Sequence, residues 1–189
     1  MSIDLLRFLT LLLFVGRFIY WTVTEKKTKD KATSHSQQTV FKRILGWGVG
    51  LFIVWQLLGL QILPFQQTLV TQIIGFLLVL AGTYITVWAR MTIGTNWAHA
   101  AEYQIKKDHE LVTSGVYNFI RHPIYAGMFF SCVGAELVAG SYIFFVFLIL
   151  LPIPAYLQAK KEEKLLTGHF GETYKTYMKK TKMFLPYIW

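Results

Sequence analysis

The sequence predicts an all-α, multi-pass membrane protein of one domain, with about five membrane-spanning helices. Hydrophobic residues make up 54% of its 189 residues and gather in long blocks that basic segments separate. Three blocks, at about 3–23, 44–63 and 69–89, are each long enough to cross about 30 Å of hydrocarbon as a helix. A fourth block, at 124–157, is longer and contains one charged residue, Glu136.

The first block is expected to be a retained membrane span rather than a cleaved signal peptide. Asp4, Arg7 and Arg17 interrupt it, no small-x-small cleavage site follows it, and basic residues come directly after it. The second block is expected to stop near Pro64, and the third to end before Arg90.

The fourth block is expected to form a tight helical hairpin, made of spans four and five. It is too long for one span, and Ala139-Gly140-Ser141 offers a turn in its middle. Pro152 and Pro154 are expected to bend the second arm near its end. Glu136 is expected to lie near the outer end of span four, where water would solvate it; a functional role is the alternative.

The basic residues predict the orientation. Of the 19 lysines and arginines, six lie within 25–43, four within 90–121 and seven from residue 160 onward, whereas 64–68 and 139–142 have none. The positive-inside rule then places the N-terminus outside, and the loop at 90–121 and the C-terminal tail in the cytoplasm. Orientation and contact with membrane lipids account for the net charge of +9, so no nucleic-acid partner is expected.

The division of the chain follows from this layout. We expect residues 1–90 to form three N-terminal spans, and residues 91–189 to form a catalytic region with a cofactor loop, the hairpin and a tail helix. The single cysteine, Cys132, excludes a disulfide framework and a cysteine metal cluster, and no metal site is expected. The sequence does not specify the oligomeric state.

The polar segment 96–125 lies between two apolar blocks. Lipid does not tolerate exposed irregular backbone, so this segment must lie at the membrane edge or line a cavity. Pro123 suits the first position of a helix, whose N-terminus attracts anions. Arg121 and His122 add donors there, and Tyr117 and Tyr125 lie close in sequence, which predicts an anion-binding, aromatic-lined corner. In the alternative, Arg121 extends to lipid head groups and His122 caps the helix.

A pair of acids, Glu162-Glu163, follows the last span. Apolar residues recur every four positions after it and predict a short amphipathic helix: Leu166, Phe170, Tyr174 and Met178. The acids are expected at the start of that helix, where they would favour its dipole. They could equally hold ribose hydroxyls or a cationic ligand.

Three motifs in this order resemble the isoprenylcysteine carboxyl methyltransferase family of integral membrane enzymes. They extend from residue 90 to the end, about half of the chain. The motifs are Gly94-x-Asn96-Trp97, then His109-x-Leu111-Val112-x-x-Gly115-x-Tyr117-x-x-x-Arg121-His122-Pro123-x-Tyr125, then Glu162-Glu163-x-x-Leu166-x-x-x-Phe170-Gly171-x-x-Tyr174-x-x-Tyr177 with a closing Leu185-Pro186.

The resemblance implies S-adenosylmethionine bound on the cytoplasmic side, and a lipophilic, prenylated methyl acceptor that enters from the bilayer. Arg121, His122, Gln158 and Glu163 are the implied catalytic residues, with Arg121 a candidate partner for the cofactor's carboxylate. The implied cofactor cradle comprises His109, Leu111, Val112, Gly115, Tyr117, Arg121, His122, Pro123, Tyr125, Glu162 and Glu163.

One position departs from the family pattern. Carboxyl-methylating members carry an arginine four residues before the acid pair, and this chain has Gln158 there. Glutamine cannot form the bidentate ion pair that arginine makes with a carboxylate. Either Lys160 or Lys161 replaces that charge, or the acceptor is not a carboxylate.

Three other functions compete with this one. The first is methylation of a phospholipid or of another lipophilic amine or thiol. The second is a membrane reductase of related topology that uses a nicotinamide cofactor. The third is a membrane protein without catalytic activity.

Overall fold

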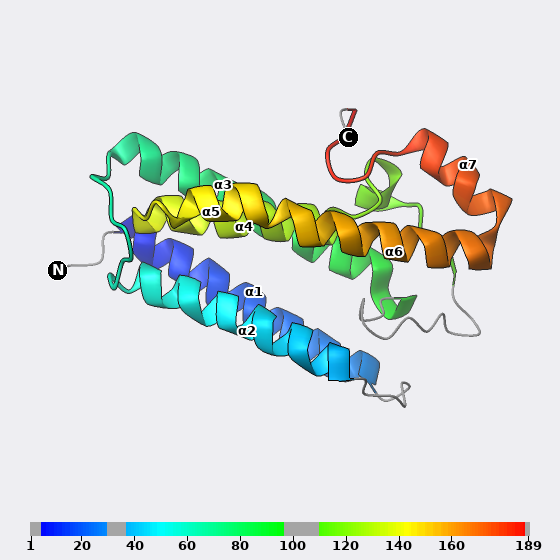
Figure 1. Cartoon of the computed structure of the whole chain (residues 1–189), viewed down its shortest axis with the longest axis horizontal. Helices are drawn as coiled ribbons and strands as arrows, with labels where there is room; N and C mark the ends of the chain where they lie inside the picture. The colour runs from blue at the N-terminus through cyan, green and yellow to red at the C-terminus, as the bar shows by residue number, and fades with distance from the viewer. Residues whose placement is uncertain (1–4, 30–36, 97–109, 188–189) are drawn as a thin grey trace.

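The computed structural model describes residues 5–29, 37–96 and 110–187. These residues form helices, and no β-strand occurs among them. Five rods run lengthwise, the fifth formed by α5 and α6 end to end, and α7 folds back at one end (Figure 1). The elements are α1 (Leu5–Lys29), α2 (Gln37–Leu57), α3 (Leu69–Ile93), η1 (Gly94–Asn96), η2 (Gly115–Asn118), α4 (Pro123–Ala139), α5 (Ile143–Leu150), α6 (Pro152–Phe170) and α7 (Glu172–Lys180).

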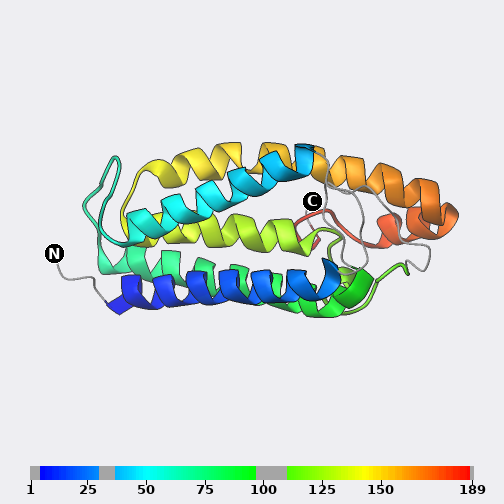
Figure 2. The ribbon, with the colours of Figure 1, turned by 90° about the horizontal axis from the view of Figure 1, so that it is seen from below.

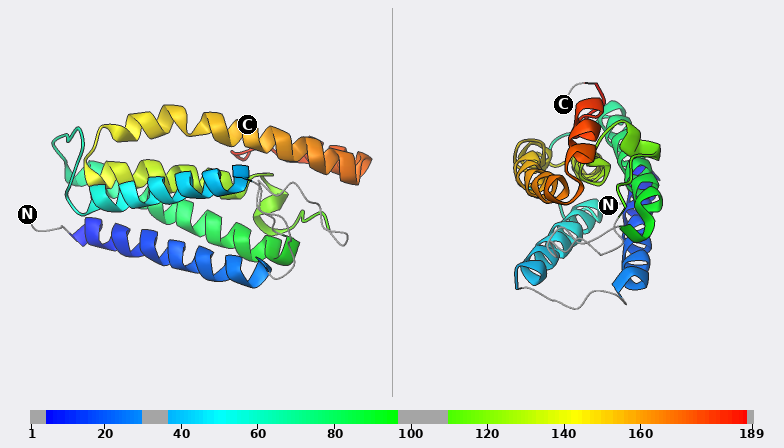
Figure 3. Two further views of the ribbon diagram at one scale, coloured as in Figure 1. Left: turned by 60° about the horizontal axis from the view of Figure 1, so that its bottom comes forward. Right: turned by 90° about the vertical axis from the view of Figure 1, so that its right-hand side faces the viewer.

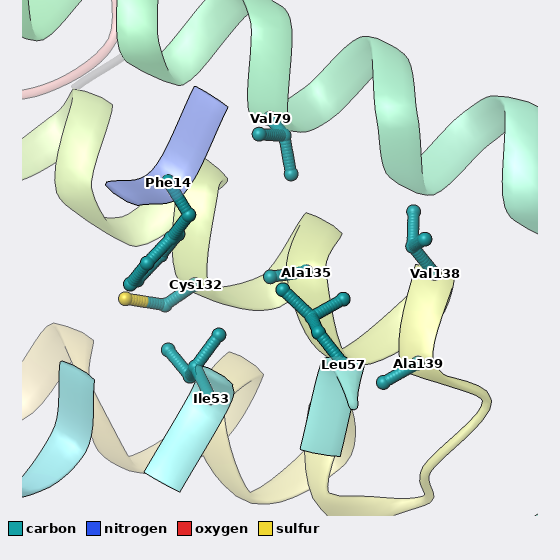
Figure 4. Packing of buried hydrophobic residues seen from close by; sticks show 8 residues of the cluster. All are labelled: Phe14, Ile53, Leu57, Val79, Cys132, Ala135, Val138 and Ala139. Atoms are coloured by element: carbon teal, nitrogen blue, oxygen red, sulfur yellow. The ribbon is translucent and has the colours of Figure 1, made fainter. Parts of the chain in front are cut away.

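The helix α4 is the centre of the bundle. It packs against α1, α2, α3 and α5, and the end-on view in Figure 3 shows it surrounded by the other rods. One core cluster joins four of these helices through Phe14 of α1, Ile53 and Leu57 of α2, Val79 of α3 and a face of α4 that includes Cys132 (Figure 4). Burying these side chains against one another fixes how the four helices sit.

The contact between α3 and α4 depends on glycine. A Cβ on Gly75 would lie 2.7 Å from the carbonyl oxygen of Gly134, and a Cβ on Gly134 would lie 2.5 Å from that of Gly75. Two turns along, Gly82 and Gly127 face each other in the same way. Small residues let helix backbones approach this closely in a membrane, where packing rather than hydrophobicity drives association.

The predicted hairpin turn is confirmed. The helix α4 ends at Ala139, and Gly140 adopts a left-handed conformation with φ of 78°. The connector from α2 to α3 is fastened to this turn, because the amide of Phe65 donates to Gly140 O (2.8 Å) and the amide of Tyr142 donates to Leu63 O (2.9 Å). Glycine suits this position since it adopts positive φ without a steric cost.

Two charged residues near that turn are buried. The expectation that water solvates Glu136 is wrong, because this residue is fully buried and its carboxylate has no hydrogen-bond partner among the described residues. Arg7 is also buried, and its Nη2 donates to Ala139 O at 2.6 Å, which ties α1 to the end of α4. Both side chains therefore belong to the interior of the bundle.

Helix ends differ from the predicted ones where tertiary contacts decide them. The second helix ends at Leu57 rather than near Pro64, because Gly59 has φ of 95° and the Gln56 side chain accepts from the amide of Ile62 (2.9 Å). Pro152 lies at the junction of α5 and α6 and not near the end of the arm, because the helix continues to Phe170.

Three helical segments are long and apolar enough to cross a membrane: Leu5–Thr24, Leu69–Ile93 and Ile143–Phe170. Two shorter apolar helices, Ile44–Leu57 and Pro123–Ala139, lie beside them. This pattern suits an integral membrane protein. The count of five spans and the side on which each end lies stay predictions.

We predict that Gly127→Ala loosens the α3–α4 contact. The added methyl group would collide with the Gly82 carbonyl and with Thr86, which are parts of the neighbouring backbone and a rigid side chain. We expect a loss of about 1–3 kcal/mol in the free energy of unfolding, measured by thermal or denaturant unfolding in detergent micelles. Gly48→Ala is the matched control, since nothing lies within 4 Å of its Cβ. Equal effects of the two substitutions would contradict the proposed packing.

Candidate functional site

The C-terminal segment fixes the start of α4. The amide of Arg121 donates to Lys182 O (2.8 Å), the amide of His122 to Met183 O (3.0 Å) and the amide of Lys182 to Phe119 O (3.2 Å). Figure 2 shows the red C-terminal segment beside the beginning of α4. Two segments about 60 residues apart in sequence thereby define one corner of the molecule.

Pro123 is the first residue of α4, as predicted. The preceding residue, His122, is the N-cap residue of α4, as the alternative expected, but its side chain makes no capping hydrogen bond to the helix. The Arg121 side chain does not extend outward into the surroundings, because it is only 9% exposed and turns toward α6. Both side chains meet the acid pair instead.

Arg121 and Glu163 form a buried ion pair. Their Nε and Oε1 atoms lie 2.7 Å apart, and the Glu163 side chain is 5% exposed. Nη1 of Arg121 also donates to the carbonyl oxygens of Met178 (3.3 Å) and Thr181. The guanidinium therefore joins the start of α4, the middle of α6 and the end of α7 through charge-assisted hydrogen bonds.

His122 lies between the two carboxylates. Its Nδ1 is 3.5 Å from Glu162 Oε2, and its Nε2 is 3.6 Å from Glu163 Oε1. Burial disfavours the charged imidazolium, but the two neighbouring carboxylates outweigh that cost and raise the pKa of His122. At these distances its buried Nε2 has no hydrogen-bond partner among the described residues.

Glu162 is the more open of the two acids, with 25% of its side chain exposed. The Tyr125 hydroxyl donates to its Oε1 at 2.5 Å, and Nε2 of Gln158 donates to the same oxygen at 3.2 Å. The Tyr125 ring stacks beside the His122 ring with centroids 5.9 Å apart. Glu162 thus presents an accessible carboxylate held by two neutral donors.

The predicted position of the acid pair was wrong. Both acids lie inside α6, which runs from Pro152 to Phe170, and a separate helix, α7, begins only at Glu172. They are two or more turns from a helix start, so the helix dipole does not explain them. Their contacts with Arg121 and His122 explain their position instead.

The loop before the corner forms part of its support. Tyr117, in η2, is buried, and its carbonyl oxygen accepts from the Tyr177 hydroxyl (2.6 Å). Gly115 has φ of 59°, and a Cβ there would lie 2.9 Å from Thr92 Oγ1 of α3. Val112 packs against the buried cluster that includes Tyr117. Leu111 is half-buried on this loop, and His109 lies outside the described residues.

An open pocket of about 320 Å³ lies beside the ion pair. Four of its lining residues are basic, namely Arg121, Lys160, Lys179 and Lys182, and the others are Tyr156, Met178, Thr181 and Met183. No pattern in the sequence predicts this pocket. Backbone carbonyls and lysines on a basic tail carry no pattern that distinguishes a site from an ordinary solvated surface.

Comparison with known proteins agrees with the predicted family resemblance. Residues 70–173 match the family model described as phospholipid methyltransferase. Protein-S-isoprenylcysteine O-methyltransferase from Xenopus laevis is 34% identical over 117 residues, which are 61% of this chain and 41% of that protein. The protein of the same name from Schizosaccharomyces pombe is 32% identical over 119 residues, 62% of this chain and 50% of that protein. The chain thus spans about half the length of these relatives or less.

A solved structure confirms the fold. The eukaryotic intramembrane Ras methyltransferase, an isoprenylcysteine carboxyl methyltransferase, superposes with a TM-score of 0.62 at 20% sequence identity. The match covers 95% of this chain and 68% of that one. The all-helical membrane architecture predicted from the sequence is therefore shared with a known intramembrane protein.

We predict that His122 makes stability depend on pH. Its pKa is higher in the folded chain than the ordinary value of about 6.5, so its stabilising effect is complete below pH 6.5 and disappears as the pH rises through the higher folded value. The difference in melting temperature between the native chain and His122→Asn should therefore be largest near pH 6 and shrink toward pH 9. A constant difference across this range would show that His122 stabilises the corner by packing alone.

Proposed function

The chain belongs to the phospholipid methyltransferase family, and from this premise we propose that it transfers a methyl group from S-adenosylmethionine to a lipophilic acceptor. The observation that carries the proposal is the position of His122, at the start of α4, between the two carboxylates of the acid pair of α6. In the predicted orientation this corner lies on the cytoplasmic side of the membrane, with the acceptor entering from the bilayer.

The residues of this corner fit such a methyl donor. S-adenosylmethionine carries a sulfonium, an ammonium and ribose hydroxyls, all of which suit a carboxylate neighbour. Glu162 offers one that is partly exposed, and the buried Nε2 of His122 has an unused hydrogen-bonding position. Tyr125 and Phe184 place aromatic rings beside His122, as an adenine or a methionine chain would require.

The two acids have different roles in this proposal. Glu163 is committed to Arg121, so it orients the corner and keeps the start of α4 against α6. Glu162 and the His122 ring are the groups that would touch the cofactor, together with Tyr125. Arg121 would act mainly as a positioning residue, since Nε and Nη1 are already bonded. Its predicted contact with the cofactor's carboxylate is left out of the proposal, because two of its three nitrogens are already bonded within the protein.

The cofactor supplies an electrophilic methyl group on sulfur. The protein would hold the cofactor, orient it toward the acceptor and shield both from water. Transfer to a carboxylate or thiolate needs no general base, so alignment and exclusion of water carry most of the acceleration. The loop residues Leu111, Val112, Gly115 and Tyr117 would shape the wall of the cradle, with the predicted help of His109.

Gln158 bears on the nature of the acceptor. It donates to Glu162 and carries no charge, so it cannot form an ion pair with an acceptor carboxylate. The relatives are named for isoprenylcysteine O-methylation, and we propose a prenylated cysteine as the acceptor on that similarity. The neutral Gln158 and the description of the family model favour a phospholipid amine as the second candidate.

We predict that Glu162→Gln weakens binding of S-adenosylmethionine. Loss of one charged hydrogen-bond partner should lower the affinity roughly 10- to 100-fold, measured by calorimetric titration of the purified protein. Glu172→Gln, which changes an exposed side chain at the start of α7, is the control and should bind like the native chain. Absence of binding to the folded native chain would overturn the proposed function. Saturable binding of a reduced nicotinamide dinucleotide would favour the reductase alternative.

We predict that the acceptor is revealed by transfer of a labelled methyl group. Purified protein is offered labelled S-adenosylmethionine with a prenylcysteine analogue, or with a phospholipid extract. Label in the prenylcysteine ester is the expected outcome, and label confined to the amine head groups of lipids would establish the second candidate. If neither substrate accepts the label while the cofactor still binds, both acceptor assignments are wrong and the cofactor site stands.

A further inference from the structure

The basic pocket beside the ion pair has cations that the protein itself does not neutralise. Arg121 bonds through Nε and Nη1, and its Nη2 has no acceptor among the described residues although the side chain is 91% buried. Lys179 and Lys182 are exposed and have no ion-pair partner in the described part of the chain. The unbonded Nη2 of Arg121 is therefore available to an acceptor in the pocket that this residue lines.

Acidic groups near the pocket do not cancel this charge. Glu163 is the acid that contacts its lining, through Oε1 to Arg121 at 2.7 Å and through Oε2 to Lys160 at 3.4 Å. Among the described residues, no acidic one lines the pocket itself. The pocket thus has four basic side chains and one neighbouring carboxylate. The positive charge that this carboxylate does not balance lies on Lys179 and Lys182. The chemistry of the pocket is that of an anion site.

The pocket also lies where an apolar helix leaves its hydrophobic surroundings. Tyr156 lines it and Leu157 beside it is 55% exposed, whereas the next turn of α6 carries Lys160. Met178 and Met183 add apolar side chains to its lining. An aromatic and apolar rim next to basic side chains is the arrangement found at the boundary between lipid and water.

We propose that this pocket binds the phosphate of a membrane phospholipid head group, with the acyl chains remaining in the adjoining bilayer. Basic pockets at the ends of membrane helices recognise such head groups. A phosphate oxygen would accept from Nη2 of Arg121, and the two lysines would neutralise the charge. Occupancy would hold α7 and residues 181–183 against the membrane surface, whatever reaction the neighbouring corner performs. The proposal does not depend on methyl transfer.

The test compares two double variants of the full chain. Lys179→Gln with Lys182→Gln removes two cations from the pocket. Lys164→Gln with Lys180→Gln removes two exposed cations that lie outside the pocket, and is the matched control. Binding of dioctanoyl-phosphatidylglycerol to the detergent-purified protein is measured by microscale thermophoresis. Dioctanoyl-glycerol, which lacks the phosphate, and inorganic phosphate serve as the comparison ligands.

We expect the native chain to bind the phospholipid, and the pocket variant to lose roughly fivefold in affinity per lysine, on the order of 20- to 30-fold together. The control variant should stay within about twofold of the native chain. Equal losses in both variants would reduce the effect to general surface attraction and overturn the proposal. Equal binding of dioctanoyl-glycerol, or inorganic phosphate binding as tightly as the lipid, would overturn it as well.

Affinity for S-adenosylmethionine, measured on the same variants, separates this pocket from the cofactor corner. We expect it to be unchanged in the Lys179→Gln, Lys182→Gln chain. A parallel loss of cofactor and lipid binding would assign the pocket to the cofactor's carboxylate and overturn the head-group assignment. Loss of cofactor binding in Glu162→Gln with unaltered lipid binding would support two separate sites.

Discussion

The buried ion pair between Arg121 and Glu163 is the interaction on which the functional corner depends. A pair removed from water costs desolvation energy, and it is tolerated only where further hydrogen bonds satisfy both groups. Here the carbonyl oxygens of Met178 and Thr181 both accept from Nη1 of the guanidinium, and Lys160 lies 3.4 Å from the other carboxylate oxygen. One side chain therefore connects three segments that lie far apart in sequence. The ion pair acts on the conformation, because it fixes where α4 begins relative to α6 and to the C-terminal tail.

The glycine contacts of α3 and α4 make that corner possible from the other side. Because Gly82 and Gly127 bring the two backbones together within the first turns of α4, the start of α4 cannot tilt away from α3. The loop at 111–118 is held to α3 and α7, with Gly115 against Thr92 and Tyr117 bonded to Tyr177. Packed elements thus support the corner from behind, which is how a site preorganises its polar groups. The packing of the apolar bundle therefore also positions the polar corner.

Local chemistry was enough to predict several features from the sequence. Pro123 opens α4 and Gly140 closes it, because proline and glycine restrict or release the backbone whatever surrounds them. Long apolar blocks predicted the helices for the same reason. The failures concern features that depend on distant contacts. Glu136 was expected to be solvated but is fully buried in the bundle, and the acid pair was expected at a helix start but lies inside the continuous α6. The carbonyls that hold Arg121 leave no trace in a side-chain pattern.

The contrast between Glu162 and Glu163 follows from helix geometry. Neighbouring residues of an α-helix point about 100° apart, so two identical acids in sequence face different surroundings. Glu163 turns toward Arg121 and is 5% exposed, whereas Glu162 turns toward Tyr125 and Gln158 and is 25% exposed. His122 lies next to both carboxylates, so its charge is coupled to the charge of each. A cationic ligand that approached Glu162 would compete with the imidazolium for the same carboxylate, while the structural pair on the far side stayed intact. Glu163 therefore holds the corner together while Glu162 remains available to a ligand. The two neighbouring acids can differ in this way because the helix that carries them passes through the corner.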